Sequence, residues 1–282
     1  MTPPDIQTVN PNAAHETTPD SIGRVLWRHR HLISQMTRRD VLGRYKGSFM
    51  GIAWSLFNPI LMLSVYTFVF SEIFKARWGQ GDEGKVQFAM FLFSGMIVFS
   101  LFSEILNRAP MLIVSNPNFV KKVVFPLEIL PASAVLAAIF HSMISLSVLW
   151  AALLFDGSLN WTAIFLPLVF FPFVMLLAGL AWMLASIGVF LRDAGQTVGM
   201  LTTVLLFLSP VFYPMSAVPD VFHPLMNANP LTFIIEQTRD ILILGRMPNW
   251  WGLAIYSLAA ALVLWGGYFW FQKTRKGFSD VL

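Results

Sequence analysis

The sequence predicts an all-helical membrane protein with six transmembrane helices, and three observations lead to this fold class. Of the 282 residues, 56% are hydrophobic and only 12% are charged, whereas soluble domains carry about 25% charged residues. The chain also contains long uncharged intervals, and its basic residues gather on one side of them. We expect one transmembrane domain over residues 21–282 with a polar tail at residues 1–20.

Six intervals between charged residues are long enough to cross a bilayer, since a spanning helix needs about 20 apolar residues. The predicted spans are about 50–71, 86–105, 130–155, 162–190, 196–213 and 249–271.

The basic residues set the expected orientation of these spans. Fourteen of the 19 lysines and arginines lie before the first span, in the second and fourth connections, or after the last span. Cytoplasmic segments carry an excess of Lys and Arg. We therefore expect both termini in the cytoplasm, as an even number of spans requires. This topology accounts for the net charge of +4 without nucleic acid binding.

The segment before the first span divides into two parts. Residues 1–20 contain four prolines and no lysine or arginine, which predicts a disordered tail. In residues 22–36, apolar residues recur at helical spacing between arginines, which favours an amphipathic helix in the cytoplasmic membrane interface. The alternative is a helix packed against protein.

Residues 215–245, between the fifth and sixth spans, are apolar but broken by Pro219, Pro224 and Pro230. Pieces this short cannot cross a bilayer. Short re-entrant helices fit the pattern, provided that protein buries their ends. A plain extracytoplasmic loop is the alternative.

Several functions are excluded by what the sequence lacks. It has no cysteine, and its predicted spans contain no paired carboxylates at catalytic spacing and no metal-binding pattern. The segment from Gly79 to Lys85 approaches a phosphate-binding loop, but Val86 replaces the Ser or Thr that holds magnesium. We therefore expect no enzyme activity, ATPase, metal or cofactor on this chain.

A few polar and aromatic residues inside or beside the spans are candidates for function. Glu104 lies four residues before Arg108 near the end of the second span, which favours an ion pair between them. His141 is the one titratable residue deep in a predicted span, where it either packs or lines a pathway. The many aromatic residues near span ends are typical of interfacial belts, and some of them alternatively line a conduit.

Five blocks of the sequence resemble the permease subunits of ABC exporters for polysaccharides, among them O-antigen, capsular polysaccharide and teichoic acid exporters. The resemblance extends from about residue 22 to the C terminus. The blocks are residues 39–59, 116–131, 192–193, 210–214 and 229–240.

The resemblance implies a permease in the bacterial cytoplasmic (inner) membrane that exports a lipid-linked, O-antigen-like polysaccharide. It implies a homodimer paired with two copies of a separate ATPase subunit, which binds the ATP and magnesium. In such permeases the second connection forms a coupling helix in a groove of the ATPase. That role falls here on Asn116, Pro117, Asn118, Phe119, Val120, Lys121, Lys122 and Val123.

The resemblance also implies that the first and fifth spans form the conduit wall and that the 215–245 region lies near an outer gate. The candidate glycan contacts are Trp54, Phe57, Tyr66 and Phe212. The candidate gate residues are Tyr213, Pro214, Glu236, Arg239 and Asp240.

Three other functions compete with this one. A drug or small-lipid ABC exporter has the same architecture. A membrane-embedded glycosyl- or acyltransferase needs acids that the spans lack. An ATP-independent carrier often shows internal repeats and ions at the membrane midplane, and the sequence shows no repeat.

Overall fold

The computed structural model describes residues 18–69, 85–121 and 125–282, and all regular elements in these ranges are helical. The longer helices are α1 (Pro19–Arg28), α2 (Arg30–Tyr45), α3 (Trp54–Tyr66), α4 (Lys85–Arg108), α7 (Ile129–Asp156), α8 (Leu166–Phe190), α9 (Ala194–Phe207), α11 (Pro230–Leu242) and α12 (Trp250–Thr274). The short ones are α5 (Met111–Val114), α6 (Pro117–Lys121), α10 (His223–Ala228) and α13 (Phe278–Val281). The described ranges also contain five 3₁₀ turns, which are η1 (Gly51–Ala53), η3 (Trp161–Phe165), η4 (Met215–Ala217), η5 (Asp220–Phe222) and η6 (Arg275–Gly277).

Some sequence predictions fall outside these ranges. They are the tail at residues 1–17, the loop from Gly79 to Gly84, and Lys122 and Val123. The helical domain begins at Pro19, two residues before the predicted boundary.

Five helical segments of the described residues are long and apolar enough to cross a membrane. They are Gly51–Val69, Phe88–Arg108, Ile129–Asp156, Trp161–Phe190 and Trp250–Val281. The remaining prediction, 196–213, coincides with α9, which has only 14 residues. At 1.5 Å per residue α9 is about 21 Å long, shorter than the roughly 30 Å hydrocarbon core. The break after α9 falls at Ser209 and Pro210, because proline cannot continue the helical hydrogen bonding.

The core surrounds α4, whose apolar face packs against α7, α9 and α11. Phe91, Leu92 and Val98 are among its buried residues. On another side, α8 and α12 form the most extensive helix pair. A side chain on Gly179 or Gly267 would collide with the backbone of the facing helix. Small residues of this kind allow close approach of membrane helices, so these glycines fix the α8–α12 spacing.

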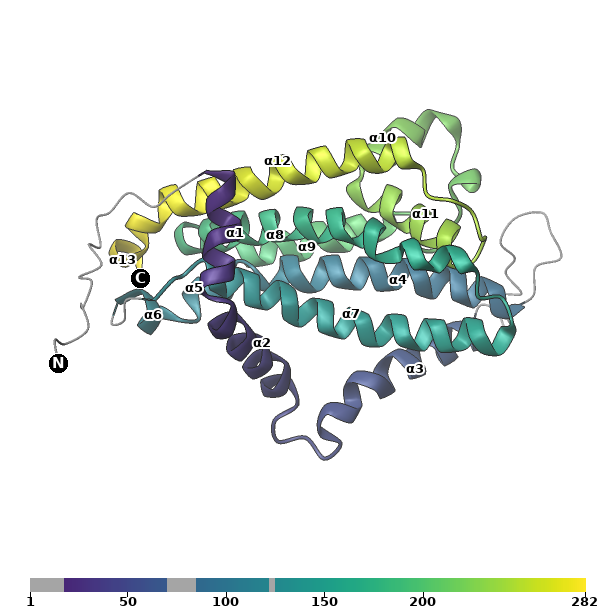
Figure 1. The fold of residues 1–282 in the computed structure, drawn as a ribbon, viewed down its shortest axis with the longest axis horizontal. Coiled ribbons are helices and arrows are strands. Elements are labelled where there is room, and N and C mark those ends of the chain that lie inside the picture. The colour runs from purple at the N-terminus through teal and green to yellow at the C-terminus, as the bar shows by residue number, and fades with distance from the viewer. Residues whose placement is uncertain (1–17, 70–84, 122–124) are drawn as a thin grey trace, which may run out of the picture.

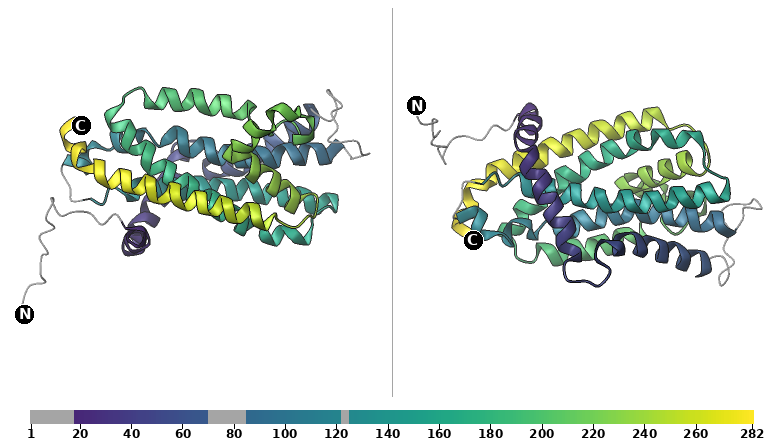
Figure 2. Two further views of the ribbon diagram at one scale, coloured as in Figure 1. Left: turned by 90° about the horizontal axis from the view of Figure 1, so that it is seen from above. Right: turned by 60° about the horizontal axis from the view of Figure 1, so that its bottom comes forward.

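The N-terminal helices lie outside this bundle. Figure 1 shows α1 crossing the long helices and α2 and α3 forming a V that points away from α7. In the right panel of Figure 2, α1 and α2 form an oblique column, whereas α3 runs beside the bundle. No residue of α3 is buried. Its apolar surface therefore remains available to lipid or to another protein.

The residues predicted as one amphipathic helix, 22–36, are divided between α1 and α2 by a break at His29, and their apolar face is partly occupied. Ile22 of α1 and Ile33 of α2 are buried in a cluster with Trp182, Tyr268 and Phe278. Trp27, on the same helix pair, is 72% exposed. The segment thus packs against protein and also presents apolar surface outward.

The two regions predicted to flank the membrane lie at opposite ends of the bundle. Helices α5, α6 and α13 lie at one end, and α10 and α11 lie toward the other (Figure 1). The long helices between them separate the predicted coupling segment from the predicted gate region.

Candidate functional site

A polar pocket of about 340 Å³ lies between α3, α4 and α7, beside the C-terminal end of α2. Trp54 and Tyr66 line it from α3. Glu104 of α4 and His141 of α7 line it from the other side. Pockets that bind small molecules commonly combine aromatic walls with a few polar groups. The pocket therefore has the chemical character of a ligand site.

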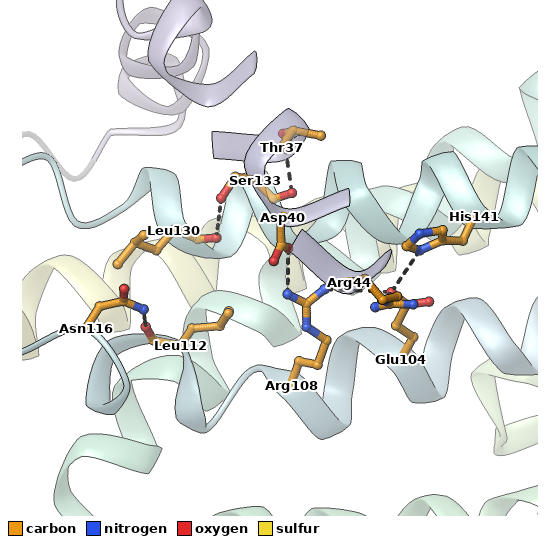
Figure 3. A network of polar contacts seen from close by, with 10 residues as sticks. All are labelled: Thr37, Asp40, Arg44, Glu104, Arg108, Leu112, Asn116, Leu130, Ser133 and His141. Carbon is orange, nitrogen blue, oxygen red and sulfur yellow. Dashed lines mark hydrogen bonds and ion pairs between the residues drawn. The ribbon is translucent and has the colours of Figure 1, made fainter. Parts of the chain in front are cut away.

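Glu104 is the centre of a charged cluster in this pocket. Arg44 of α2 donates to Glu104 Oε1 over 2.5 Å, and His141 Nδ1 lies 3.3 Å from the same oxygen. Figure 3 shows these side chains converging from α2, α4 and α7. Glu104 is half-buried whereas Arg44 is exposed, so the pair joins the two helices with solvent access on the arginine side.

A second ion pair joins the same helices one turn away. Arg108 Nη2 lies 2.5 Å from Asp40 Oδ2 and its Nη1 lies 3.7 Å from Glu104 (Figure 3). The predicted contact between Glu104 and Arg108 is present, but it is the longest of the four. Each of the two acidic residues has its shortest ion pair with an arginine on the facing helix.

The spacing of these four charged residues in the sequence is compatible with ion pairs between the two helices. Asp40 and Arg44 are four residues apart on α2, and Glu104 and Arg108 are four apart on α4. Residues at this spacing share one helix face. When two such helices face each other, the acid of each can pair with the arginine of the other. Only the packing of α2 against α4 shows that this pairing occurs.

Two buried polar atoms of the pocket lack a hydrogen-bond partner within the described part of the chain. They are Nε2 of His141 and the hydroxyl of Ser142, and both residues line the pocket. Buried polar atoms are normally hydrogen-bonded. Water or a polar ligand in the pocket would supply the partners.

The four predicted glycan contacts lie in three places. Trp54 and Tyr66 line the pocket. Phe57 is 42% exposed and contacts Trp54 edge to face, with 5.5 Å between ring centroids. Phe212 lies after α9 and packs beside Phe207. In the single chain, therefore, only two of the four share a cavity.

Within the predicted coupling segment the described residues form one short helix, α6, which follows α5 at one end of the bundle. Helix α6 begins at Pro117, which is a favourable first residue because it has no N–H to satisfy. Asn116 Nδ2 donates to the Leu112 carbonyl over 2.9 Å, and this bond ties α6 to α5. The rings of Phe119 and Phe125 stack with centroids 4.3 Å apart.

The outer surface of this segment is polar. Pro117, Asn118 and Lys121 are exposed, whereas Asn116, Phe119 and Val120 are half-buried. Above it, a side chain on Gly188 of α8 would collide with the backbone of Pro110. The start of α5 is therefore closely packed against α8, and the exposed side of α6 is free to contact another protein.

Among the predicted gate residues, Arg239 of α11 is the most buried, at 2% exposure. It donates to the carbonyl oxygens of Phe91, Pro210 and Val211 over 3.1, 2.6 and 2.9 Å. Burial lowers the pKa of Arg239 to about 10, so it stays protonated at neutral pH. Arg239 thus joins α11 to α4 and to the break after α9.

The other gate residues surround this contact. Glu236 Oε1 accepts from Arg239 over 3.3 Å, and burial raises the pKa of Glu236. Asp240 pairs with Arg246 at 3.7 Å. The Tyr213 hydroxyl donates to the Phe207 carbonyl over 2.8 Å, and Pro214 precedes a 3₁₀ turn at Met215–Ala217.

Sequence reasoning missed three residues that hold α11 in place. Asn229 accepts from Leu231 N at the start of α11 and donates to the Leu208 carbonyl. Near the end of α11, Thr162 and Asn160 donate to the carbonyls of Ile241 and Ile243 over 2.6 and 2.9 Å. Asparagine before a proline is a recognisable helix cap, whereas the roles of Asn160 and Thr162 depend on tertiary contacts.

No group of three or more His, Asp or Glu side chains in the described ranges is arranged to hold a metal ion. The chemistry that the pocket offers is hydrogen bonding, stacking on aromatic rings and ion pairing.

Comparison with known proteins gives a consistent result. Residues 31–243 match the model of the ABC-2 type transporter family. The chain is 27% identical over 260 residues to the O-antigen export system permease protein RfbA of Myxococcus xanthus, covering 91% of this chain and 97% of that protein. It is 24% identical over 254 residues to RfbA of Klebsiella pneumoniae, covering 89% and 95%. Identity to the polysialic acid transport protein KpsM of Escherichia coli is 22% over 225 residues, covering 78% and 84%.

Proposed function

The chain belongs to the ABC-2 type transporter family, and we propose that it is the permease subunit of an ATP-driven exporter of a lipid-linked polysaccharide. The observation that carries the proposal is the alignment of 91% of this chain with 97% of an O-antigen export permease. Two sequences that align over almost their whole lengths share their domain organisation. The cargo class of the relatives is therefore the first one to test here.

The proposed permease has six spans, with α9 and the segment after it as the fifth. Helix α11 packs against α4 and α8, and its residues Leu231, Ile234 and Ile235 are fully buried. A short apolar helix that is buried against two spanning helices fits a re-entrant position, where irregular backbone is covered by protein. With both termini cytoplasmic, α5 and α6 face the cytoplasm and α10 and α11 face the other side.

The proposed assembly contains two copies of this chain and two copies of a separate ATPase subunit, which binds ATP and magnesium. The unburied apolar surface of α3 supports a second copy of the chain beside it. The exposed polar surface of α6 supports contact with the ATPase. Helices α1 and α2 would lie at the interface between the membrane and the cytoplasm. The whole chain would lie in the bacterial cytoplasmic membrane.

In the proposed mechanism, closure of the ATPase dimer displaces α5 and α6. The displacement passes to α4, because only two residues separate the end of α4 at Arg108 from the start of α5 at Met111. From α4 it reaches α2 through the pairs of Glu104 with Arg44 and of Arg108 with Asp40. Because α2 leads into α3, the motion changes the spacing between α3 and the bundle, where the polar pocket lies.

The polar pocket is then a subsite of the glycan path. Trp54 and Tyr66 supply aromatic surface on which a sugar ring can stack. The Ser142 hydroxyl and His141 Nε2, which have no hydrogen-bond partner among the described residues, can bond sugar hydroxyls. Phe57 would reach the cargo across the interface of two copies.

Deletion of the gene in its native bacterium tests the proposed cargo. We expect loss of the surface polysaccharide and accumulation of its lipid-linked precursor on the cytoplasmic side of the membrane, both reversed by the wild-type gene. Labelling of the glycan in intact and in permeabilised cells distinguishes the two locations.

The rival reading, a drug or small-lipid exporter, predicts a different phenotype. In that case the deletion strain keeps its surface polysaccharide and becomes sensitive to an apolar toxin or alters its outer-leaflet lipids. That result would contradict the proposed cargo while leaving the family membership intact.

A further inference from the structure

A second cavity, separate from the polar pocket, is an apolar groove of about 810 Å³ between α2 and the helices α7 and α8. Its floor consists of aliphatic and aromatic side chains, among them Ile33, Val135 and Ile139. Arg30 and Arg38, both on α2, are the two charged residues that line it. The groove thus combines an almost wholly apolar floor with positive charge from one helix.

The length of the groove corresponds to one membrane leaflet. Thr37 of α2 donates to the Ser133 carbonyl, so α2 crosses α7 near its beginning. The groove reaches Met143, ten residues farther along α7. At 1.5 Å per residue this is about 15 Å, which is half of the roughly 30 Å hydrocarbon core.

The α2 side of the groove carries positive charge suited to an anionic group. The Arg30 guanidinium lies 4.8 Å from the ring centroid of the exposed Trp27, and its Nη1 bonds the Trp27 carbonyl. A guanidinium has five N–H donors, so donors of Arg30 remain for another partner. Arg38 is exposed, and the acid two residues from it, Asp40, is already paired with Arg108.

We propose that the groove binds one anionic phospholipid of the leaflet that α2 faces, with its phosphate at Arg30 and Arg38 and an acyl chain along α7 toward Met143. The positive charge on α2 and the leaflet-deep apolar floor both match this ligand. Interfacial tryptophan and arginine are typical of the headgroup region. In the proposed orientation this is the cytoplasmic leaflet, and the bound lipid would stabilise the contact of α2 with α7.

Binding of a phospholipid requires only that the chain lies in a membrane, and not that its cargo is a glycan. Because lipid binding is measured without transport, it can be absent while the proposed export function holds, or present while that function fails.

Native mass spectrometry of the full-length chain in detergent, with phosphatidylglycerol and phosphatidylethanolamine added in equal amounts, tests the proposal. We expect one phosphatidylglycerol to be retained per chain in preference to phosphatidylethanolamine. Each basic residue near an anionic lipid adds a similar amount to the binding free energy. Removing two of them, by Arg30→Gln with Arg38→Gln, should therefore weaken retention of phosphatidylglycerol about 30-fold. Arg192→Gln, which removes an exposed arginine outside the groove, should leave it unchanged.

A second variant tests the apolar part of the site. Leu136→Trp introduces a larger side chain into the groove without altering charge, and it should also reduce retention of phosphatidylglycerol. Equal retention of the two phospholipids, or unchanged retention in the double arginine variant, would overturn the proposal. Displacement of phosphatidylglycerol by substoichiometric polyprenyl diphosphate would overturn it as well, since the site would then belong to a lipid carrier. So would photocrosslinking from Met143 to a second copy of the chain instead of to lipid.

Discussion

Arg239 is the side chain on which the region after α9 depends most. Two of its bonds go to the carbonyls of Pro210 and Val211, at the break after α9, and a third goes to the Phe91 carbonyl of α4. A planar guanidinium can bond several acceptors at once, which a lysine cannot do in the same way. The contact is possible because residue 95, opposite it on α4, is a glycine. Arg239 is therefore a structural residue of the proposed gate region.

Gly95→Ala tests this account of the residue. The new methyl group would lie 2.8 Å from Arg239 Nη2 and 3.4 Å from Val211 Cα. Since Arg239 is held by three carbonyls, it cannot move aside freely, and overpacking of this kind costs about 1–3 kcal/mol. We expect the apparent melting temperature in detergent to fall by about 2–10 °C.

Gly266→Ala is the matched control, because its methyl group would meet no atom within 4 Å. Alanine is also favoured over glycine inside a helix, so the melting temperature should not fall. Equal melting temperatures for the Gly95 variant and the wild type would show that the Arg239 contact is not tightly packed.

At the scale of elements, the short helix α6 and the long helix α4 form the proposed route of coupling. Lys121 is exposed on α6, in the segment where the resemblance implies contact with an ATPase. An exposed lysine has little effect on the fold of its own chain. Changing its charge should therefore affect a partner contact more than the stability of the bundle.

Charge reversal by Lys121→Glu with Lys122→Glu tests the coupling role. We expect the permease to insert and fold normally while its stimulation of the partner ATPase falls at least about tenfold, since like charges across an interface are strongly unfavourable. ATP hydrolysis by the copurified complex measures this effect. Lys273→Glu changes an exposed lysine on α12 and should leave stimulation intact. Stimulation that is the same in all three proteins would remove the coupling assignment from α6.

The helices that the sequence predicted well are those whose signal is local. The intervals without charge located α4, α7, α8 and α12, because length and apolarity decide whether a helix can cross a bilayer. The end of α9 was placed six residues too late, at 213 instead of Phe207, since apolarity continues past Pro210 although the helix does not. The Pro-broken pieces contain the short helices α10 and α11. Their attachment through Arg239, Asn229 and Thr162 depends on distant carbonyls that no local pattern reveals.

The candidate site was less predictable than the fold for the same reason. His141 and Glu104 were recognised as unusual residues, but the contact between them arises only from the packing of α4 on α7. Trp54 and Phe212 were both candidates for glycan contact, yet of the two only Trp54 lines the pocket. Side chains from different helices form one site only after the helices are packed.

At the scale of the whole molecule, the chain forms a helical bundle with a polar end segment, an opposite end closed by α11, and a peripheral α3 with unburied apolar surface. The family membership supplies the expected motor in a separate subunit. The central claim is therefore that this chain moves a lipid-linked glycan only when it works with an ATPase.

Reconstitution of the full-length chain with its partner ATPase in proteoliposomes tests that claim most directly. The measurement is the fraction of a labelled lipid-linked polysaccharide that becomes accessible to an impermeant glycosidase on the far side of the membrane. We expect translocation that requires this chain, the ATPase and hydrolysable ATP together. Translocation by this chain alone without ATP, or ATP-driven transport of a small apolar compound with no movement of the glycan, would contradict the account.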